Sequence, residues 1–248
     1  MENNELIKRA EDLLRRCERS CTVTHSLFLS PAERYDIERW TLHRADCNVL
    51  FHGGQPDCER TAAFFLPYYM DAESFEPSEY ISAMKLTAHF GAPGHRDYLG
   101  AALGMGIGRE WLGDIRIIDS EAWLFCMPSV LSHLLTMDKV GRCGVKTQTL
   151  ELSEVPCVEK SVKPVSFSVM SMRLDAVAAG LFSLSRSECV RRIEAGLLSL
   201  NYHQNFRCDA PVQVGDIISL RGAGKGEITG TGGSSRKGRL FVYGQIYK

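Results

Sequence analysis

The sequence predicts an α+β protein built in three parts, and three observations lead to that class. Residues 1–78 combine amphipathic helical patterns with a short strand pair, and residues 79–152 alternate strands and helices in a regular order. Residues 167–248 begin with two short helices and continue as strands. A stretch rich in Ser, Pro, Glu and Lys, residues 153–166, predicts a linker before the third part.

The first part is expected to hold two helices and a β-hairpin. Residues 3–20 have an amphipathic helical pattern. Ser30-Pro31-Ala32-Glu33 predicts the start of a second helix that runs to about residue 41, because Ser caps free amides, Pro suits the first turn and Glu completes a capping box. Short strands are expected at 48–51 and 61–66, on either side of a Gly-rich turn.

The second part is expected to follow the order strand, helix, strand, strand, helix, strand. This is the order of the ferredoxin-like (RRM-like) split unit. The predicted elements are 80–89, 96–105, 115–118, 122–126, 128–137 and 145–152.

Glycines at 104, 106 and 108 could be mistaken for a dinucleotide or S-adenosylmethionine loop. Such a loop needs a strand before the glycines and a helix after them, so that the phosphate meets a helix N-terminus. Here a helix precedes the glycines and a strand follows, which favours a helix end turned by a left-handed glycine. We therefore expect no cofactor at this loop.

The third part is predicted to start with a helical hairpin. Leu174, Val177, Ala178 and Leu181 recur at helical spacing and predict one buried stripe. Ser185 followed by Glu188 predicts a capping box, in which Ser185 accepts from the Glu188 amide while the Glu188 side chain reaches back. The second helix should bury residues at 189, 190, 193 and 197 and leave Arg191 and Arg192 towards solvent.

Positive charge gathers in this third part. Residues 167–248 hold eleven Lys and Arg against six Asp and Glu, a formal balance of +5, whereas residues 1–166 have a balance of −6. Arg186 lies in the first turn of the second helix, where free amides and the helix dipole already favour a phosphate. The pattern indicates contact with nucleic acid; the alternative is a solvated hairpin whose arginines bind nothing.

Four short motifs occur in order here: Arg173-Leu174-Asp175, Ser185-Arg186-Ser187, Ile193-Glu194-Ala195-Gly196 and Val214-Gly215-Asp216. In this order and spacing they resemble the S4 RNA-binding domain, an αL-type module. The resemblance implies that Asp175 orders the hairpin or an arginine. It implies RNA contacts at Arg173, Ser185, Arg186, Arg191, Arg192, Asn201, Arg221 and Lys225. Arg236, Lys237 and Arg239 stand in a basic, Gly-rich turn before the last strand, which either lies along phosphates or is a solvated hairpin tip.

A second set of motifs covers most of the rest of the chain: Phe51-x-Gly53-Gly54, Glu59-Arg60, His95-Arg96-Asp97-Tyr98-Leu99-Gly100 and Gly108-Arg109-Glu110-x-Leu112-Gly113-Asp114-Ile115. These motifs resemble the bacterial YlmH-type proteins, which join such a middle domain to a C-terminal S4 domain. The resemblance implies a cytoplasmic factor that binds ribosomal RNA, with tRNA as a further candidate, on the large ribosomal subunit and acts on stalled translation complexes. Either the triplet His95-Arg96-Asp97 caps and rigidifies the middle helix, or Arg96, with His95, makes a second RNA contact.

Other classes have less support in the sequence. Cys17, Cys21 and His25 are spaced as possible zinc ligands on a helix, but a fourth ligand is absent and core packing is the simpler interpretation. No catalytic set stands at a recognisable spacing, no apolar run is long enough to span a bilayer, and the nine cysteines form no Cys-x-x-Cys pair. We expect a non-enzymatic, cytoplasmic monomer without metal or cofactor. The alternatives are an RNA-modifying enzyme with its active site in residues 80–152 and an interaction protein associated with cell division.

Overall fold

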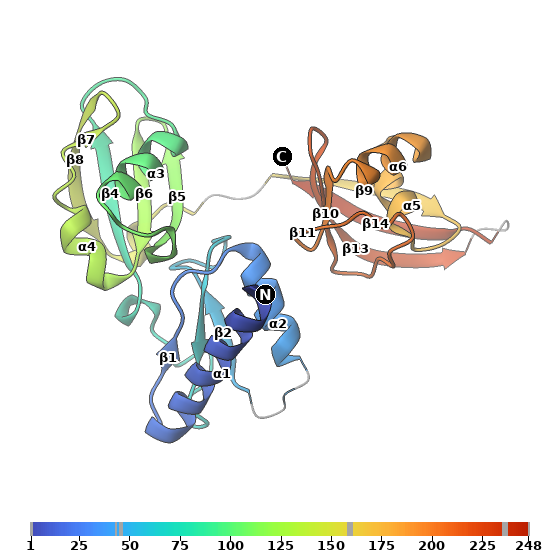
Figure 1. Cartoon of the computed structure of the whole chain (residues 1–248). Helices are drawn as coiled ribbons and strands as arrows, with labels where there is room; N and C mark the ends of the chain where they lie inside the picture. Colours follow the sequence, from blue (N-terminus) through green and yellow to red (C-terminus); the bar gives the residue numbers. More distant parts are fainter. Residues whose placement is uncertain (1, 43, 45–46, 158–160, 235–237, 248) are drawn as a thin grey trace. The chain divides into compact units, whose positions relative to one another are not determined.

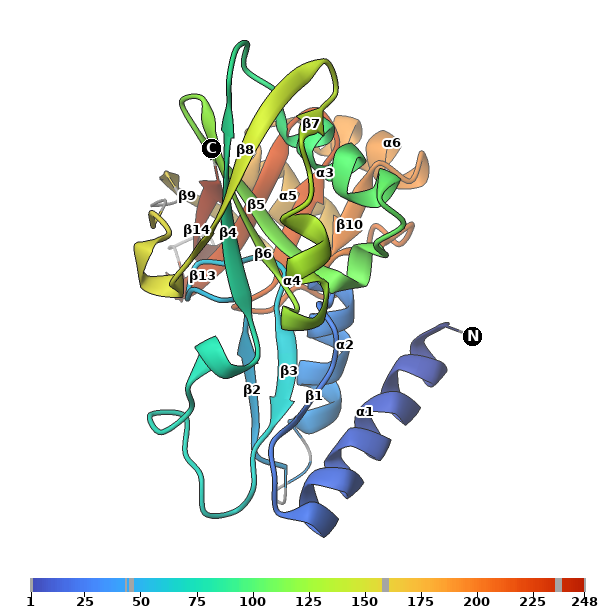
Figure 2. The ribbon, with the colours of Figure 1, turned by 90° about the vertical axis from the view of Figure 1, so that its left-hand side faces the viewer.

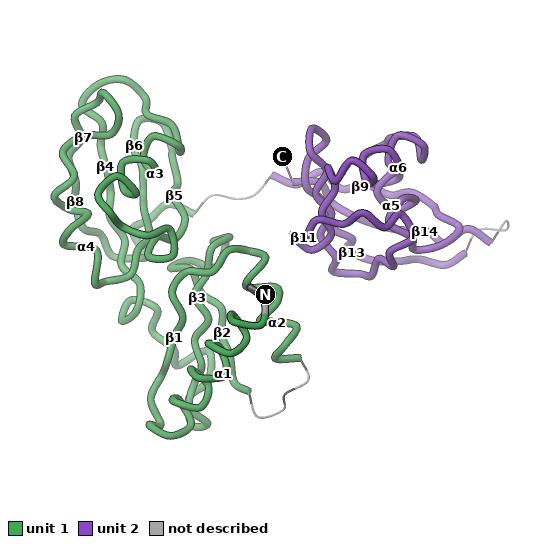
Figure 3. Tube along the Cα trace, viewed as in Figure 1, with its two compact units in different colours: residues 1–158 green, residues 159–248 purple. Residues whose placement is uncertain are grey.

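The computed structural model describes residues 2–42, 44, 47–157, 161–234 and 238–247 (Figure 1). Helices and strands are mixed along the whole chain, so the α+β class is confirmed. The chain forms two compact units, residues 1–158 and residues 159–248, shown in different colours in Figure 3. The first two predicted parts therefore lie together in unit 1.

Unit 1 begins with two helices that pack on a three-stranded antiparallel sheet (Figure 2). The Ser30 capping box is present as expected: the Glu33 amide donates to the Ser30 hydroxyl at 3.3 Å, and the Ser30 amide donates to Glu33 Oε2 at 2.7 Å. The first strand was not expected from the sequence, since it is only two residues long. The elements are α1 (Glu2–Ser20), β1 (Thr24–His25), α2 (Pro31–Thr41), β2 (Val49–His52) and β3 (Ala62–Phe65), in the strand order β1-β3-β2.

A second sheet of unit 1 has the strand order β5-β6-β4-β8-β7, with all neighbouring strands antiparallel. Helices α3 and α4 cover one face of it, and the core between them includes Leu86, Tyr98, Leu124 and Leu134. Gly106 ends the α3 segment with a positive φ of 81°, as the glycine interpretation required. The elements are β4 (Ser82–Ala88), α3 (His95–Gly104), β5 (Leu112–Ile118), β6 (Glu121–Cys126), α4 (Pro128–Leu134), β7 (Lys139–Val140) and β8 (Cys143–Leu150).

Part of the other face of this second sheet is covered by the chain itself. Ala83, Trp123 and Phe125 pack there into a common core with Phe64 of β3 and with Val155, which follows the last strand. The β8 end of this face stays accessible, since Lys146 and Gln148 are exposed there.

Unit 2 is a six-stranded antiparallel sheet with two helices on one face. The prediction that the linker runs to residue 166 was wrong, because residues 162–166 belong to edge strand β9. Pro164 is compatible with that place, since an edge strand does not need every amide for pairing. The elements are β9 (Val162–Val169), α5 (Leu174–Leu181), α6 (Arg186–Glu194), β10 (Leu198–Leu200), β11 (His203–Gln204), β12 (Ile217–Leu220), β13 (Gly224–Ser234) and β14 (Leu240–Tyr247), in the strand order β11-β10-β12-β13-β14-β9.

None of the helices in the described ranges has the length and apolarity that crossing a membrane requires.

Candidate nucleic-acid interface

The α5–α6 hairpin forms as the sequence predicts, but the second half of its capping box and the burial of residues 190 and 197 differ from the expectation. All four residues of the α5 stripe are buried, and Ser185 accepts from the Glu188 amide at 3.2 Å. The prediction that the Glu188 side chain accepts from the Ser185 amide was wrong. The Glu188 carboxylate accepts from Arg191 and Arg192 instead. Leu197, expected to be buried after this helix, is 36% exposed.

A buried carboxylate joins the two helices at their N-terminal ends. The Asp175 side chain is 3% exposed, and it accepts from Nε and Nη2 of both Arg173 and Arg186. The Arg186 contacts are 2.9 and 2.8 Å, and those of Arg173 are 3.2 and 3.4 Å. The prediction that Asp175 orders an arginine is confirmed.

The charges of this cluster support one another. Burial alone would raise the pKa of Asp175, but the hydrogen bonds from Arg173 and Arg186 outweigh it and the pKa is lowered. The hydrogen bond to Asp175 in turn raises the pKa of Arg173. The two arginine side chains remain 43% and 60% exposed, so two fixed guanidinium groups face solvent over one hidden anion.

Arg191 and Arg192 lie further along α6 and differ in exposure. The Arg191 side chain is 75% exposed, whereas Arg192 is 28% exposed and donates from Nε to Glu188 at 2.8 Å. The expectation that both lie towards solvent holds for Arg191, which also donates to Glu188, whereas Arg192 is partly buried. Glu188 lies between them and neutralises part of their charge.

Asn201 belongs to the interior of the fold, which corrects its interpretation as an RNA contact. It is 7% exposed, donates to Asp216 at 2.8 Å and accepts from the Ile217 amide at 2.8 Å. Its φ of 50° is left-handed, which Asn tolerates better than most residues. Asn201 therefore fixes the turn between β10 and β11.

The remaining basic candidates of unit 2 do not all lie beside the helices. Lys225 alternates along β13 with Gly226, which packs on Leu181 of α5, so Lys225 faces the opposite side of the sheet. Arg239 is anchored to Ser168. Arg221 follows β12 and is exposed, while Arg236 and Lys237 lie outside the described residues.

In unit 1, His95 and Arg96 are exposed at the first turn of α3. The capping role expected of the triplet is carried by Asp97, which accepts from the Gly94 amide at 2.8 Å. Capping thus falls to Asp97, and Arg96 is left accessible to a ligand.

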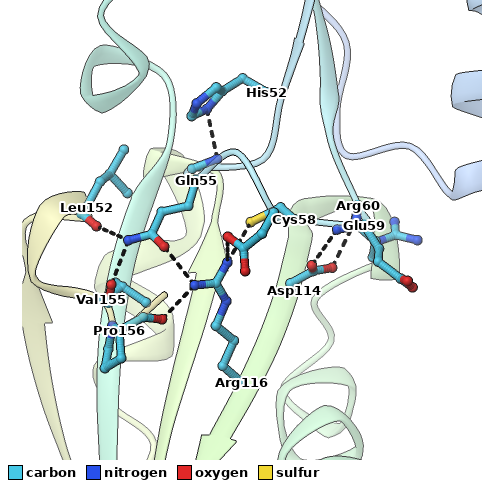
Figure 4. Close-up of polar contacts among 12 residues, drawn as sticks. His52, Gln55, Cys58, Glu59, Arg60, Asp114, Arg116, Leu152, Val155 and Pro156 are labelled. Carbon is cyan, nitrogen blue, oxygen red and sulfur yellow. Dashed lines mark hydrogen bonds and ion pairs between the residues drawn. The ribbon is translucent and has the colours of Figure 1, made fainter. Parts of the chain in front are cut away.

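A second arginine–carboxylate cluster, missed from the sequence, lies between the two sheets of unit 1 (Figure 4). Arg116 of β5 is 8% exposed; it donates to Gln55 Oε1 and the Pro156 carbonyl, both at 2.7 Å, and to Asp57 Oδ1 at 2.5 Å. Its guanidinium also stacks 5.2 Å from the ring centroid of Phe125. We call these residues the Arg116 cluster.

Neighbouring contacts tie the same loop to β5. Asp114 accepts from the amides of Glu59 and Arg60 at 2.6 and 3.0 Å, and Arg60 donates to the carbonyl of Leu112. Only glycine fits at Gly54, since its φ is 105° and a Cβ there would lie 2.4 Å from a Phe125 ring atom. These contacts explain the glycine and Glu-Arg motifs as structural.

The Arg116 cluster has no reactive nucleophile. Burial raises the pKa of the Cys58 thiol to about 11, so it stays protonated near neutral pH. Within the described residues no three His, Cys, Asp or Glu gather as metal ligands. Cys17 is instead buried and donates to the carbonyl of Phe65 at 3.2 Å.

Three comparisons show which known proteins this chain is similar to. Residues 76–154 match the family model described as "Putative RNA-binding domain in YlmH". The chain is 27% identical over 218 residues to the ribosome-associated protein quality control protein P2 of Bacillus subtilis (strain 168), covering 87% of this chain and 84% of that protein. A solved structure, the cell division protein ylmH from Streptococcus pneumoniae, is similar in fold with a TM-score of 0.54 and 17% identity over 62% of this chain and 94% of that one. The resemblance to the YlmH-type proteins is confirmed.

Proposed function

We propose that this chain is a cytoplasmic, non-enzymatic RNA-binding factor of the ribosome. It docks structured ribosomal RNA of the large subunit, and tRNA, through the α5–α6 hairpin, and it handles stalled translation complexes. The similarity to a ribosome-associated quality control protein supports the proposed association with the ribosome. The match of residues 76–154 to a putative RNA-binding domain supports the proposal that the ligand is RNA.

The folds of both units suit this role. The antiparallel strand order β5-β6-β4-β8, with a helix after β4 and another after β6, supports a ferredoxin-like unit at 79–152. The helical hairpin followed by antiparallel strands supports an S4-type domain at 167–248. The predicted boundary at residues 78/79 remains part of this proposal, while the third part begins with β9 at Val162 instead of at residue 167.

The observation that carries the proposal is the pair of guanidinium groups fixed by Asp175. An arginine that already has its rotamer set loses less entropy when it binds a phosphate. Arg186 also lies at the first turn of α6, where backbone amides favour an anion. Structured RNA is recognised largely through shape and backbone, which a rigid pair of cations suits.

Replacement of Arg186 by Ala tests the proposal. We expect a loss of about 1–3 kcal/mol in RNA affinity, as for other placed arginines. We also expect a log–log salt slope that is shallower by roughly 0.7–0.9. Folding should change little, because Asp175 keeps its contacts with Arg173 and with the Ala176 amide.

The measurement is co-sedimentation with large ribosomal subunits, and binding to their purified RNA, across a salt series. Arg142→Ala is the matched control, since Arg142 is an exposed arginine of unit 1 away from the hairpin. Unchanged binding of Arg186→Ala at every salt concentration, with an unchanged melting curve, would remove the α5–α6 face from the interface.

A further inference from the structure

The face of the unit 2 sheet that α5 and α6 leave uncovered carries exposed aromatic rings. Along β14, Val242 and Gly244 are buried towards the helices, while Phe241 and Tyr243 point the other way and are 42% and 48% exposed. We call this surface the open sheet face. Exposed apolar groups that lie together on a surface mark an interaction site.

The residues around these rings are small. The strand register places Ser168 opposite Phe241, and Ser166 and Gly230 opposite Tyr243. Phe241 and Tyr243 are two residues apart on one strand, so their Cα atoms are separated by roughly 7 Å. The two rings therefore stand side by side without a bulky neighbour on the adjacent strands, which leaves them accessible to a flat ligand.

Positive charge borders the rings. Lys225 Nζ lies 5.2 Å from the ring centroid of Tyr202 and 5.4 Å from that of Tyr247, so the ammonium group is held on this face. Arg239 is anchored beside Phe241, because its Nε donates to the Ser168 hydroxyl at 3.0 Å. Cations at both ends of an aromatic row suit a ligand that alternates flat rings with negative charge.

The carboxylate on this face is already engaged. Tyr247 donates its hydroxyl proton to Glu227 at 2.6 Å, and Gln245 donates to the same oxygen at 3.0 Å. The negative charge of Glu227 is thereby partly compensated by donors of β14. Lys225 and Arg239 supply positive charge on the same face.

We propose that the open sheet face is a second RNA-binding surface, which stacks the unpaired bases of a single-stranded segment on Phe241 and Tyr243. This inference rests on the proposed function and adds a ligand class to it: the α5–α6 face takes backbone of structured RNA, and the open sheet face takes unpaired bases. A duplex keeps its bases stacked on one another, whereas a single strand offers a free ring face. The basic balance of residues 167–248 favours RNA over an average protein partner.

The experiment compares two RNA probes on the full chain. One is a labelled ten-nucleotide oligouridylate, and the other is a stable RNA hairpin with a short closing loop. Replacing Phe241 and Tyr243 together by Leu keeps apolar bulk and removes the rings. Because stacking contributes a factor of roughly five or more per ring, the loss of both rings should weaken binding of the oligouridylate by at least about tenfold. Binding of the hairpin should be unchanged.

Two further variants make the result specific to stacking. Tyr243→Phe retains the ring and should keep the affinity for oligouridylate. Tyr68→Ala removes a ring that is 89% exposed in unit 1 and should leave both affinities unchanged. Melting curves of all variants show whether unit 2 remains folded.

The outcomes separate this inference from the function on which it rests. Wild-type affinity of the Leu double variant for oligouridylate, with intact hairpin binding, overturns the inference and leaves the proposed function standing. Failure of the wild-type chain to bind either RNA overturns the proposed function itself.

Discussion

The two units contain arginine–carboxylate clusters made of the same chemical groups in opposite arrangements. In unit 1 the cation is buried: Arg116 is 8% exposed and Asp57 is 20% exposed. In unit 2 the anion is buried: Asp175 is 3% exposed, while Arg173 and Arg186 are 43% and 60% exposed. The difference decides what each cluster can do.

The guanidinium group of Arg116 donates its hydrogen bonds to other residues of unit 1. It joins the β2–β3 loop, strand β5 and the segment after β8, so its contacts hold three distant segments of unit 1 together. Asp175 instead binds two arginines from the buried side of the hairpin and leaves much of their guanidinium groups exposed to solvent. A buried cation thus indicates a structural clamp, and a buried anion under exposed cations indicates a surface prepared for an anionic ligand.

The largest expected effect is on the folding of unit 1. Replacing Arg116 by Ala leaves Asp57 and the Gln55 amide oxygen without their partner. Removal of one member of a buried ion pair typically costs about 3–5 kcal/mol of unfolding free energy. We expect a value near the lower end, since Asp57 is partly exposed, measured as a lower melting transition of unit 1 by calorimetry.

The control for this variant is Arg9→Ala, which removes an arginine that is 73% exposed and should leave the melting transition unchanged. RNA affinity should remain that of the wild type as long as the chain is folded. A strong loss of RNA affinity with wild-type stability would reverse the comparison and make Arg116 a ligand contact.

The next largest effect is expected on RNA affinity when Arg173 and Arg186 are no longer held in place by Asp175. Asp175→Asn keeps the shape of the side chain but removes its charge. If the net charge alone governed binding, RNA affinity would rise; if positioning governs it, affinity should fall. We expect a fall of about 1–2 kcal/mol, from the ordering cost of two arginine side chains that are no longer fixed. The same RNA titration, at constant salt, decides between the two.

The Asp175 cluster also gives unit 2 a defined dependence on pH. The pKa of Asp175 is lower in the folded chain than in an unfolded one, where a carboxyl of this type titrates near about 3.9. Its stabilising contribution is therefore complete above about pH 4 and is lost as the pH falls through the folded pKa. Unfolding free energies of wild type and Asp175→Asn should differ at pH 7 and converge in acid; a constant difference would contradict this assignment.

How far the sequence leads depends on whether the interactions are local. The α5 stripe and the Ser185 cap follow from spacings of three and four residues, and both are present. Strand β9 was missed because Pro164 suggested a linker, although Val165, Phe167 and Val169 alternate as in a strand. Its pairing with β14 joins residues far apart in the chain, which no local pattern specifies.

The Arg116 cluster could not be predicted for the same reason. Arg116 and Asp57 are 59 positions apart, and only the fold brings them together. One signal was available in the sequence, namely an arginine between Ile115 and Ile117 in a strand. Such an arginine must either lie on an exposed face of the sheet or have a buried hydrogen-bonding partner. Nothing in the sequence named that partner. The Asp175 contacts were predictable because Arg173 is two residues away and Arg186 begins the next helix.

The smallest effect is expected at Arg191, and it tests whether fixing an arginine matters more than exposing it. Arg191 is more exposed than Arg186, but its partner Glu188 is shared with Arg192 and lies on the same helix. Replacing Arg191 by Ala should weaken RNA binding by less than about threefold, in keeping with the modest energies of exposed charges. The melting curve should not change, because Glu188 retains Arg192. If Arg191→Ala instead costs as much affinity as Arg186→Ala under the same salt conditions, charge density on α6 rather than fixation by the buried Asp175 controls RNA binding.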